Sequence, residues 1–112
     1  MAYEEEFADR IRAALRGRMG FAERKMFGGV GFLLSGNMCV GIWKENLILR
    51  IGPEEYAGFL TRPHVKLFDI TGRPMAGWIM VEPGGFTDAK ALARWIDHAV
   101  NYVKVLPAKK NK

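Results

Sequence analysis

Three glycines lie close together in the segment Lys25-Met26-Phe27-Gly28-Gly29-Val30-Gly31, and their spacing could serve a phosphate group. In P-loops and dinucleotide sites, the backbone N–H groups of a glycine-rich loop cradle phosphate oxygens. This segment lacks the lysine–serine ending of a P-loop. The residues after it, Phe32-Leu33-Leu34, are typical of a strand rather than a helix. Because glycine is costly inside a strand, the pattern favours a bulge, a bend, or a close approach by another backbone or a ligand.

The segment from Asp69 to Trp78 places a charged side chain near an aromatic one. Gly72 and Pro74 are expected to fix a turn with Arg73 at its tip. Arginine and tryptophan are frequent anchors of interaction surfaces. The alternative is an internal role, in which Arg73 pairs with Asp69 and Trp78 fills the core.

Arg50 is a similar case, because it interrupts the apolar run Leu47 to Ile51. An arginine in an apolar strand normally has a carboxylate partner or takes part in binding.

Patterns for catalysis and metal binding are weak. His64 and His98 are the only histidines, and neither lies within a ligand pattern. Ser35 falls in a predicted turn without the Gly-x-Ser-x-Gly elbow of a serine hydrolase, and Cys39 falls in an apolar run. We therefore predict no catalytic residues, no metal and no cofactor, and a buried Cys39.

The formal net charge is +5, and part of it is concentrated near the N-terminus. The residues concerned are Arg12, Arg16, Arg18, Arg24 and Lys25. Such a cluster could follow the phosphates of a nucleic acid. The other interpretation is a solvated helix face, in which Arg12 and Arg16 complement the helix dipole.

We predict one domain over residues 1–107 and a basic, disordered tail over 108–112. The acidic N-terminus is unlike a signal peptide, and no apolar run approaches the ~20 residues that span a bilayer. A cytoplasmic protein without membrane contact is expected.

The apolar spacing predicts the elements that position these residues. Phe7, Ile11 and Leu15 indicate a helix over residues 3–16. The elements expected after it are three strands centred near Phe32, Val40 and Leu49, a helix over 53–60, strands over 65–70 and 78–81, and a long helix capped by Thr87. The order α-βββ-α-ββ-α predicts an α+β domain of two layers, with an antiparallel sheet of about five strands and the helices on one side.

The strands over 38–43 and 47–51 are apolar on both of their alternating faces. An antiparallel sheet with one wet face should alternate polar and apolar residues. The second face is therefore expected to be covered, by a partner or by a second copy of the chain.

Several segments together resemble the TfoX N-terminal domain family. They are Arg24 to Phe32, Gly36-Asn37-Met38, Leu47 to Gly52, Phe68 to Trp78, and a terminal helix ending at Leu106-Pro107. The resemblance covers roughly residues 5–107 and implies a small α+β domain without established catalytic residues. The family takes its name from a regulator of competence for DNA uptake, whose action is tied to transcription by the cyclic-AMP receptor protein. That regulator carries a second, helical domain, which we expect this chain to lack because it stops at Lys112.

Two hypotheses follow. The preferred one is a non-enzymatic interaction module that docks a protein, possible partners being the transcription machinery or a second copy in a homodimer. Its candidate partner-binding residues are Lys25, Phe27, Gly28, Gly29, Gly31, Arg50, Arg73, Pro74 and Trp78. The alternative is a nucleic-acid-binding protein that uses the basic segment from Arg10 to Lys25, or a small-ligand-binding domain.

Overall fold

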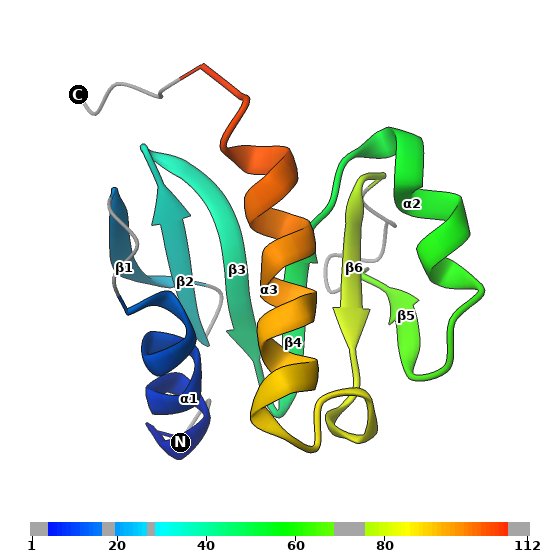
Figure 1. Ribbon diagram of the computed structural model, residues 1–112, viewed down its shortest axis with the longest axis horizontal. Coiled ribbons are helices and arrows are strands. Elements are labelled where there is room, and N and C mark those ends of the chain that lie inside the picture. Colours follow the sequence, from blue (N-terminus) through cyan, green and yellow to red (C-terminus); the bar gives the residue numbers. More distant parts are fainter. Residues whose placement is uncertain (1–4, 17–19, 27–28, 69–75, 108–112) are drawn as a thin grey trace.

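The computed structural model describes residues 5–16, 20–26, 29–68 and 76–107 (Figure 1). Its elements are α1 (Glu5–Leu15), β1 (Phe21–Met26), β2 (Gly29–Leu34), β3 (Asn37–Trp43), β4 (Asn46–Arg50), α2 (Pro53–Leu60), β5 (Val65–Leu67), β6 (Trp78–Val81), the 3₁₀ turn η1 (Pro83–Gly85) and α3 (Ala89–Val103). The predicted residues Phe27, Gly28, Arg73, Pro74 and Arg18 lie outside the described part, as does the tail over 108–112.

The strands form one antiparallel sheet in the order β1-β2-β3-β4-β6-β5. The predicted α+β class is confirmed. The described residues form a sheet of six strands, where about five were expected. The missed strand is β1, whose Glu23-Arg24-Lys25 run hides any apolar alternation. Its position explains this composition, since charged residues are typical of an edge strand that must not pair further.

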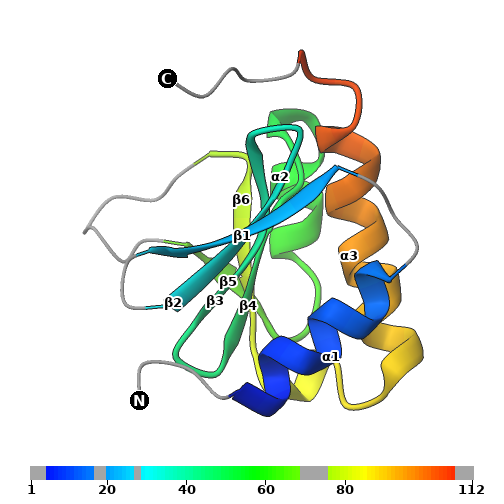
Figure 2. The same ribbon diagram turned by 90° about the vertical axis from the view of Figure 1, so that its left-hand side faces the viewer.

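All three helices lie on one side of the sheet, as the edge-on view in Figure 2 shows. The main core fills the space between these layers. Alternate residues of the central strands enter it, including Val40, Ile42, Leu47 and Leu49, all of which are fully buried. From α3 the core receives Leu92, Ile96, Ala99 and Val103, the stripe expected from their helical spacing.

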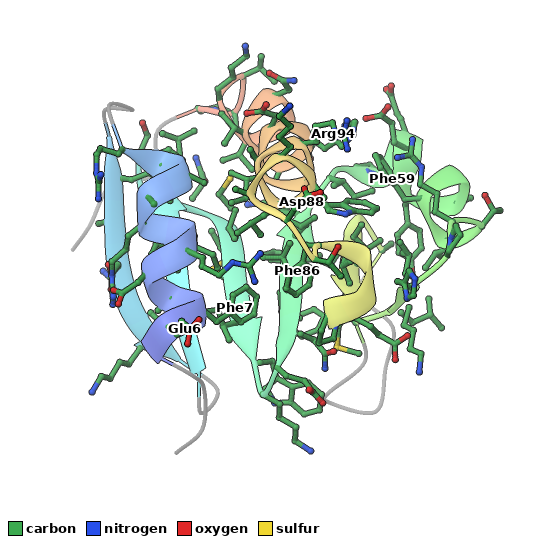
Figure 3. All side chains as sticks on the ribbon, turned by 60° about the horizontal axis from the view of Figure 1, so that its bottom comes forward. Glu6, Phe7, Phe59, Phe86, Asp88 and Arg94 are labelled. Atoms are coloured by element: carbon green, nitrogen blue, oxygen red, sulfur yellow. The ribbon has the colours of Figure 1, made fainter. Side chains whose placement is uncertain are left out.

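The segment that leads into α3 is tied to α1 by two contacts. The rings of Phe7 and Phe86 stack with their centroids 5.0 Å apart, and the Arg10 Nη2 donates to the Phe86 carbonyl oxygen at 2.9 Å (Figure 3). The helix cap is Asp88, whose carboxylate accepts from the Ala91 N–H at 2.7 Å. The predicted cap, Thr87, is therefore wrong by one residue. Both types can cap, and only the backbone geometry decides between neighbours.

A register shift between Phe32 and Leu33 places Cys39 in the main core. Phe32 pairs with Val40, whereas Leu33 pairs with Met38, so Cys39 is the extra residue of a bulge in β3. Its side chain is fully buried, as predicted.

Gly29 confirms the expected close approach of two backbones, but the second backbone belongs to the sheet itself. A Cβ at Gly29 would lie 1.9 Å from the Ile42 carbonyl oxygen of β3. A side chain can be placed there only if β2 and β3 separate, so the glycine is required by strand packing rather than by a partner.

We predict that Gly29→Ala lowers the free energy of unfolding by about 3 kcal/mol, the upper range for forcing extra atoms into a packed site. The matched control is Gly58→Ala in α2, where a new Cβ would meet nothing within 4 Å. That change should stabilise the protein by about 0.5–1 kcal/mol, because alanine favours a helix. Urea unfolding of both variants tests the pair. Equal effects of the same sign would contradict the packing argument.

Candidate docking face

The face of the sheet opposite the helices carries no described helix (Figure 2). We call it the open sheet face. Strand alternation and register assign to it the residues Arg24, Gly31, Leu33, Gly41, Trp43, Ile48, Arg50, Lys66, Trp78 and Met80, and Phe68 packs with them. The central strands β3 and β4 carry apolar residues on this face as well as on the helix side, as the sequence indicated.

A second hydrophobic cluster occupies the middle of the open sheet face. Ile48, Phe68 and Met80 are at most 9% exposed, and Trp43 and Trp78 pack against them. The rings of Phe68 and Trp78 lie with their centroids 6.0 Å apart. Both tryptophans are half-buried, so part of each ring is accessible from outside.

Arg50 lies at one end of this cluster, paired across the strands with Trp78. Its guanidinium carbon is 5.5 Å from the centroid of the Trp78 ring and 6.0 Å from that of Tyr102. Within the described residues no carboxylate lies within 4.0 Å of it. The two rings hold the cation in place, and no described residue accepts a hydrogen bond from its five N–H donors.

Trp43 is the last residue of β3, and it pairs with Asn46 at the other end of β4 from Arg50. The Lys44 Nζ is 4.7 Å from the centroid of its ring. Both ends of the open sheet face therefore combine a half-buried tryptophan with a cation.

The structure brings together some of the predicted partner-binding residues and separates others. Arg50, Trp78 and Gly31 share the open sheet face, Gly31 lying between Arg24 and Gly41. Lys25 pairs with Val30 and so belongs to the helix side of the edge strand. The partner-binding residues predicted from the sequence do not include Trp43, Ile48, Phe68 and Met80, although the strands with two apolar faces indicated the surface that they form.

The basic segment does not form one continuous surface. Arg12 is occupied by two carboxylates, Asp9 at 2.6 Å and Glu23 at 2.5 Å. Arg24 and Lys25 are neighbours in β1 and so project from opposite faces. Arg16 is exposed at the end of α1. Consequently, those of the candidate cations that the structure describes are either paired or divided between two sides of the sheet.

The Arg12 pair also changes the acidity of its partner. Hydrogen bonding to the Arg12 guanidinium lowers the pKa of Glu23, against a smaller opposing effect of burial. The same hydrogen bond raises the pKa of Arg12 further above its ordinary value. This pair links α1 to the edge strand β1.

The described residues also bear on metal binding and on membrane insertion. No three histidine, cysteine, aspartate or glutamate side chains gather there as a group of metal ligands. Among the same residues, no helix has the length and apolar character to cross a membrane.

Comparison with known families gives one match. The family model described as the TfoX N-terminal domain matches residues 13–102, which is well over half of the chain. A search of the curated proteins finds no match. The matched range runs from α1 to α3 and so includes every strand of the open sheet face.

The Glu23–Arg12 pair predicts a pH dependence of stability. Because folding lowers the pKa of Glu23, the pair stabilises the protein above the pKa of the unfolded chain, and this contribution is lost as the pH falls through the folded value. Both side chains are more than one-third exposed, so solvent screening limits the effect to less than about 1 kcal/mol. Glu23→Gln should destabilise at pH 7, and the destabilisation should be smaller at pH 3, as measured by urea unfolding.

Glu45→Gln is the matched control, because Glu45 is exposed in the β3–β4 turn and forms no ion pair with a described residue. It should change stability little at either pH. A Glu23→Gln effect of the same size at pH 3 and pH 7 would mean that the pair acts through packing rather than charge.

Proposed function

This chain belongs to the TfoX N-terminal domain family, and from that premise we propose that it is a non-enzymatic interaction module which docks a protein partner on the open sheet face. The family suggests a competence-related regulatory domain and is not known as enzymatic. The docking mode and the kind of partner are our own inference. They are argued from the surface and not from the family.

The observation that supports the proposal most is the second hydrophobic cluster. Ile48 is fully buried under Trp43, Trp78, Phe68 and Met80 although no described helix lies on that side. Tryptophan, arginine and methionine are enriched at protein interfaces, where a few such side chains carry most of the binding energy. Here they occur together around one apolar centre.

The charge of this face favours a different protein over a second copy. The described charged residues on its strands are all cations, namely Arg24, Arg50 and Lys66. Lys66 is compensated by Glu82 at 3.0 Å, whereas Arg24 and Arg50 have no carboxylate within 4.0 Å among the described residues. In a two-fold dimer the same patch meets itself, so cations would face cations. A partner with an apolar surface and a carboxylate opposite Arg50 fits better.

Site-specific photo-crosslinking in cells of the native host tests this proposal. A photoreactive phenylalanine analogue at Trp43 should give discrete adducts with another protein. The same analogue at Ala13, which is exposed on α1, should give none. Arg50→Glu should reduce the Trp43 adducts at least tenfold, because a charge-assisted contact becomes a repulsive one.

Arg50→Glu breaks no described ion pair but loses the ring contacts with Trp78 and Tyr102, so the thermal midpoint should fall by only about 5 °C and the protein should stay folded. Equal crosslinking from Trp43 and Ala13, or adducts that persist in Arg50→Glu, would argue against the docking face. An adduct of twice the mass of the chain would replace the proposed partner by a second copy.

A further inference from the structure

A second surface feature lies on the helix side of the sheet, between α3 and the corner that joins α2 to β5. It is a cavity of about 310 Å³ lined by Arg62, Gly85, Ala91, Arg94, Trp95 and His98. Figure 3 shows Arg94 on α3 and Phe59 on α2 on the two sides of this region. Its volume falls at the lower end of the range for small-molecule sites.

The helix α3 supplies one wall through residues that share a face. Arg94 and Trp95 lie three and four residues after Ala91, and His98 lies four and three residues after them, so the four side chains share one face of the helix. Trp95 is fixed by its indole Nε1, which donates to the Gly85 carbonyl oxygen at 2.9 Å. His98 is held edge-on to Phe59, with ring centroids 4.9 Å apart.

The opposite wall is Arg62, which follows α2. Its guanidinium carbon lies 4.3 Å from the centroid of the Phe59 ring and 5.8 Å from that of Trp95. An arginine that packs flat on aromatic rings keeps its donors in a fixed orientation. The ring of Phe59 thus positions both Arg62 and His98 around one cavity.

The charges around this cavity are unbalanced. Its lining contains two arginines and one histidine but no carboxylate. Within the described residues, neither Arg62 nor Arg94 has a carboxylate within 4.0 Å, and neither donates a side-chain hydrogen bond. By contrast, Arg10, Arg12 and Lys66 are all used by internal partners.

We propose that this cavity binds a small anionic molecule whose phosphate or carboxylate group accepts hydrogen bonds from Arg62 and Arg94. Guanidinium groups match the geometry of both anions, and two of them facing one cavity favour a molecule over a single bulk ion. Trp95 and His98 supply ring surface for the uncharged part of the ligand. The site lies across the sheet from the open sheet face, so this inference stands independently of the docking proposal.

Titration of the ¹⁵N-labelled chain, followed by NMR, tests the site. The probes are inorganic phosphate, adenosine monophosphate and citrate, which separate a bare anion, a phosphate on a ring-bearing molecule and a carboxylate source. The indole N–H resonance of Trp95 should shift in a saturable way at millimolar concentration with at least one of them. Arg62→Gln and Arg94→Gln should each weaken that binding about tenfold or more.

The matched control is Arg16→Gln, which removes an equally exposed arginine from α1 and should leave the affinity unchanged. The spectrum of each variant shows directly whether the fold is retained. No saturable shift with any of the three probes would overturn the inference. Equal weakening by Arg16→Gln would do the same, because binding would then reflect the net charge rather than this cavity.

Discussion

The packing of α3 on the central strands is the interaction on which the rest of the structure depends. Its stripe of Leu92, Ile96, Ala99 and Val103 is at most 2% exposed, and it covers the side of β3 and β4 that carries Val40 and Leu49. Burial of each large aliphatic side chain contributes about 1.5–3 kcal/mol. Because α1 and α2 lie on the same side, the described helices stabilise one face of the sheet, and none of them covers the other (Figures 1 and 2).

The open sheet face is consequently stabilised by its own side chains. β4 shows this most clearly, since Leu47, Ile48 and Leu49 are consecutive and all fully buried. Leu47 and Leu49 reach the main core, whereas Ile48 is covered by the aromatic residues of the second cluster. Of these aromatic residues, Phe68 is buried, whereas Trp43 and Trp78 are half-buried. Under the proposed function, the two tryptophans that help to cover Ile48 are also the rings that a partner would meet.

The sequence was sufficient to predict the helices and strands whose apolar residues recur at regular spacing. It predicted α2, β6 and the stripe of α3, because their spacing depends only on local geometry. It missed β1, whose charged residues are explained by two long-range facts: its edge position and the contact from Glu23 to Arg12. Local spacing carries neither fact.

The residues of the candidate sites likewise fall into those that the sequence alone could predict and those that only the fold brings together. Arg50 and Trp78 could be selected from sequence, because an arginine in an apolar strand and a tryptophan beside a charged turn are unusual locally. Trp43 and Met80 join them only through strand register. The anion cavity could not be predicted at all. It requires the α2–β5 corner and α3 to meet, and each of Arg62, Arg94 and His98 alone is an ordinary surface residue.

The distribution of cations argues for specific recognition over general attraction to polyanions. Arg12 and Lys66 pair with carboxylates, which lowers the positive surface charge that a nucleic acid would find. Arg50 and Arg62 have no described carboxylate partner, and each packs against two aromatic rings. Arg50 belongs to the open sheet face, whereas Arg62 lies on the helix side of the sheet. Ring packing fixes the direction of their N–H donors, so less side-chain entropy is lost when an anion is bound. A cation with oriented donors can distinguish one anionic ligand from another by the geometry of its hydrogen bonds. Long-range attraction by the net charge does not depend on such an orientation.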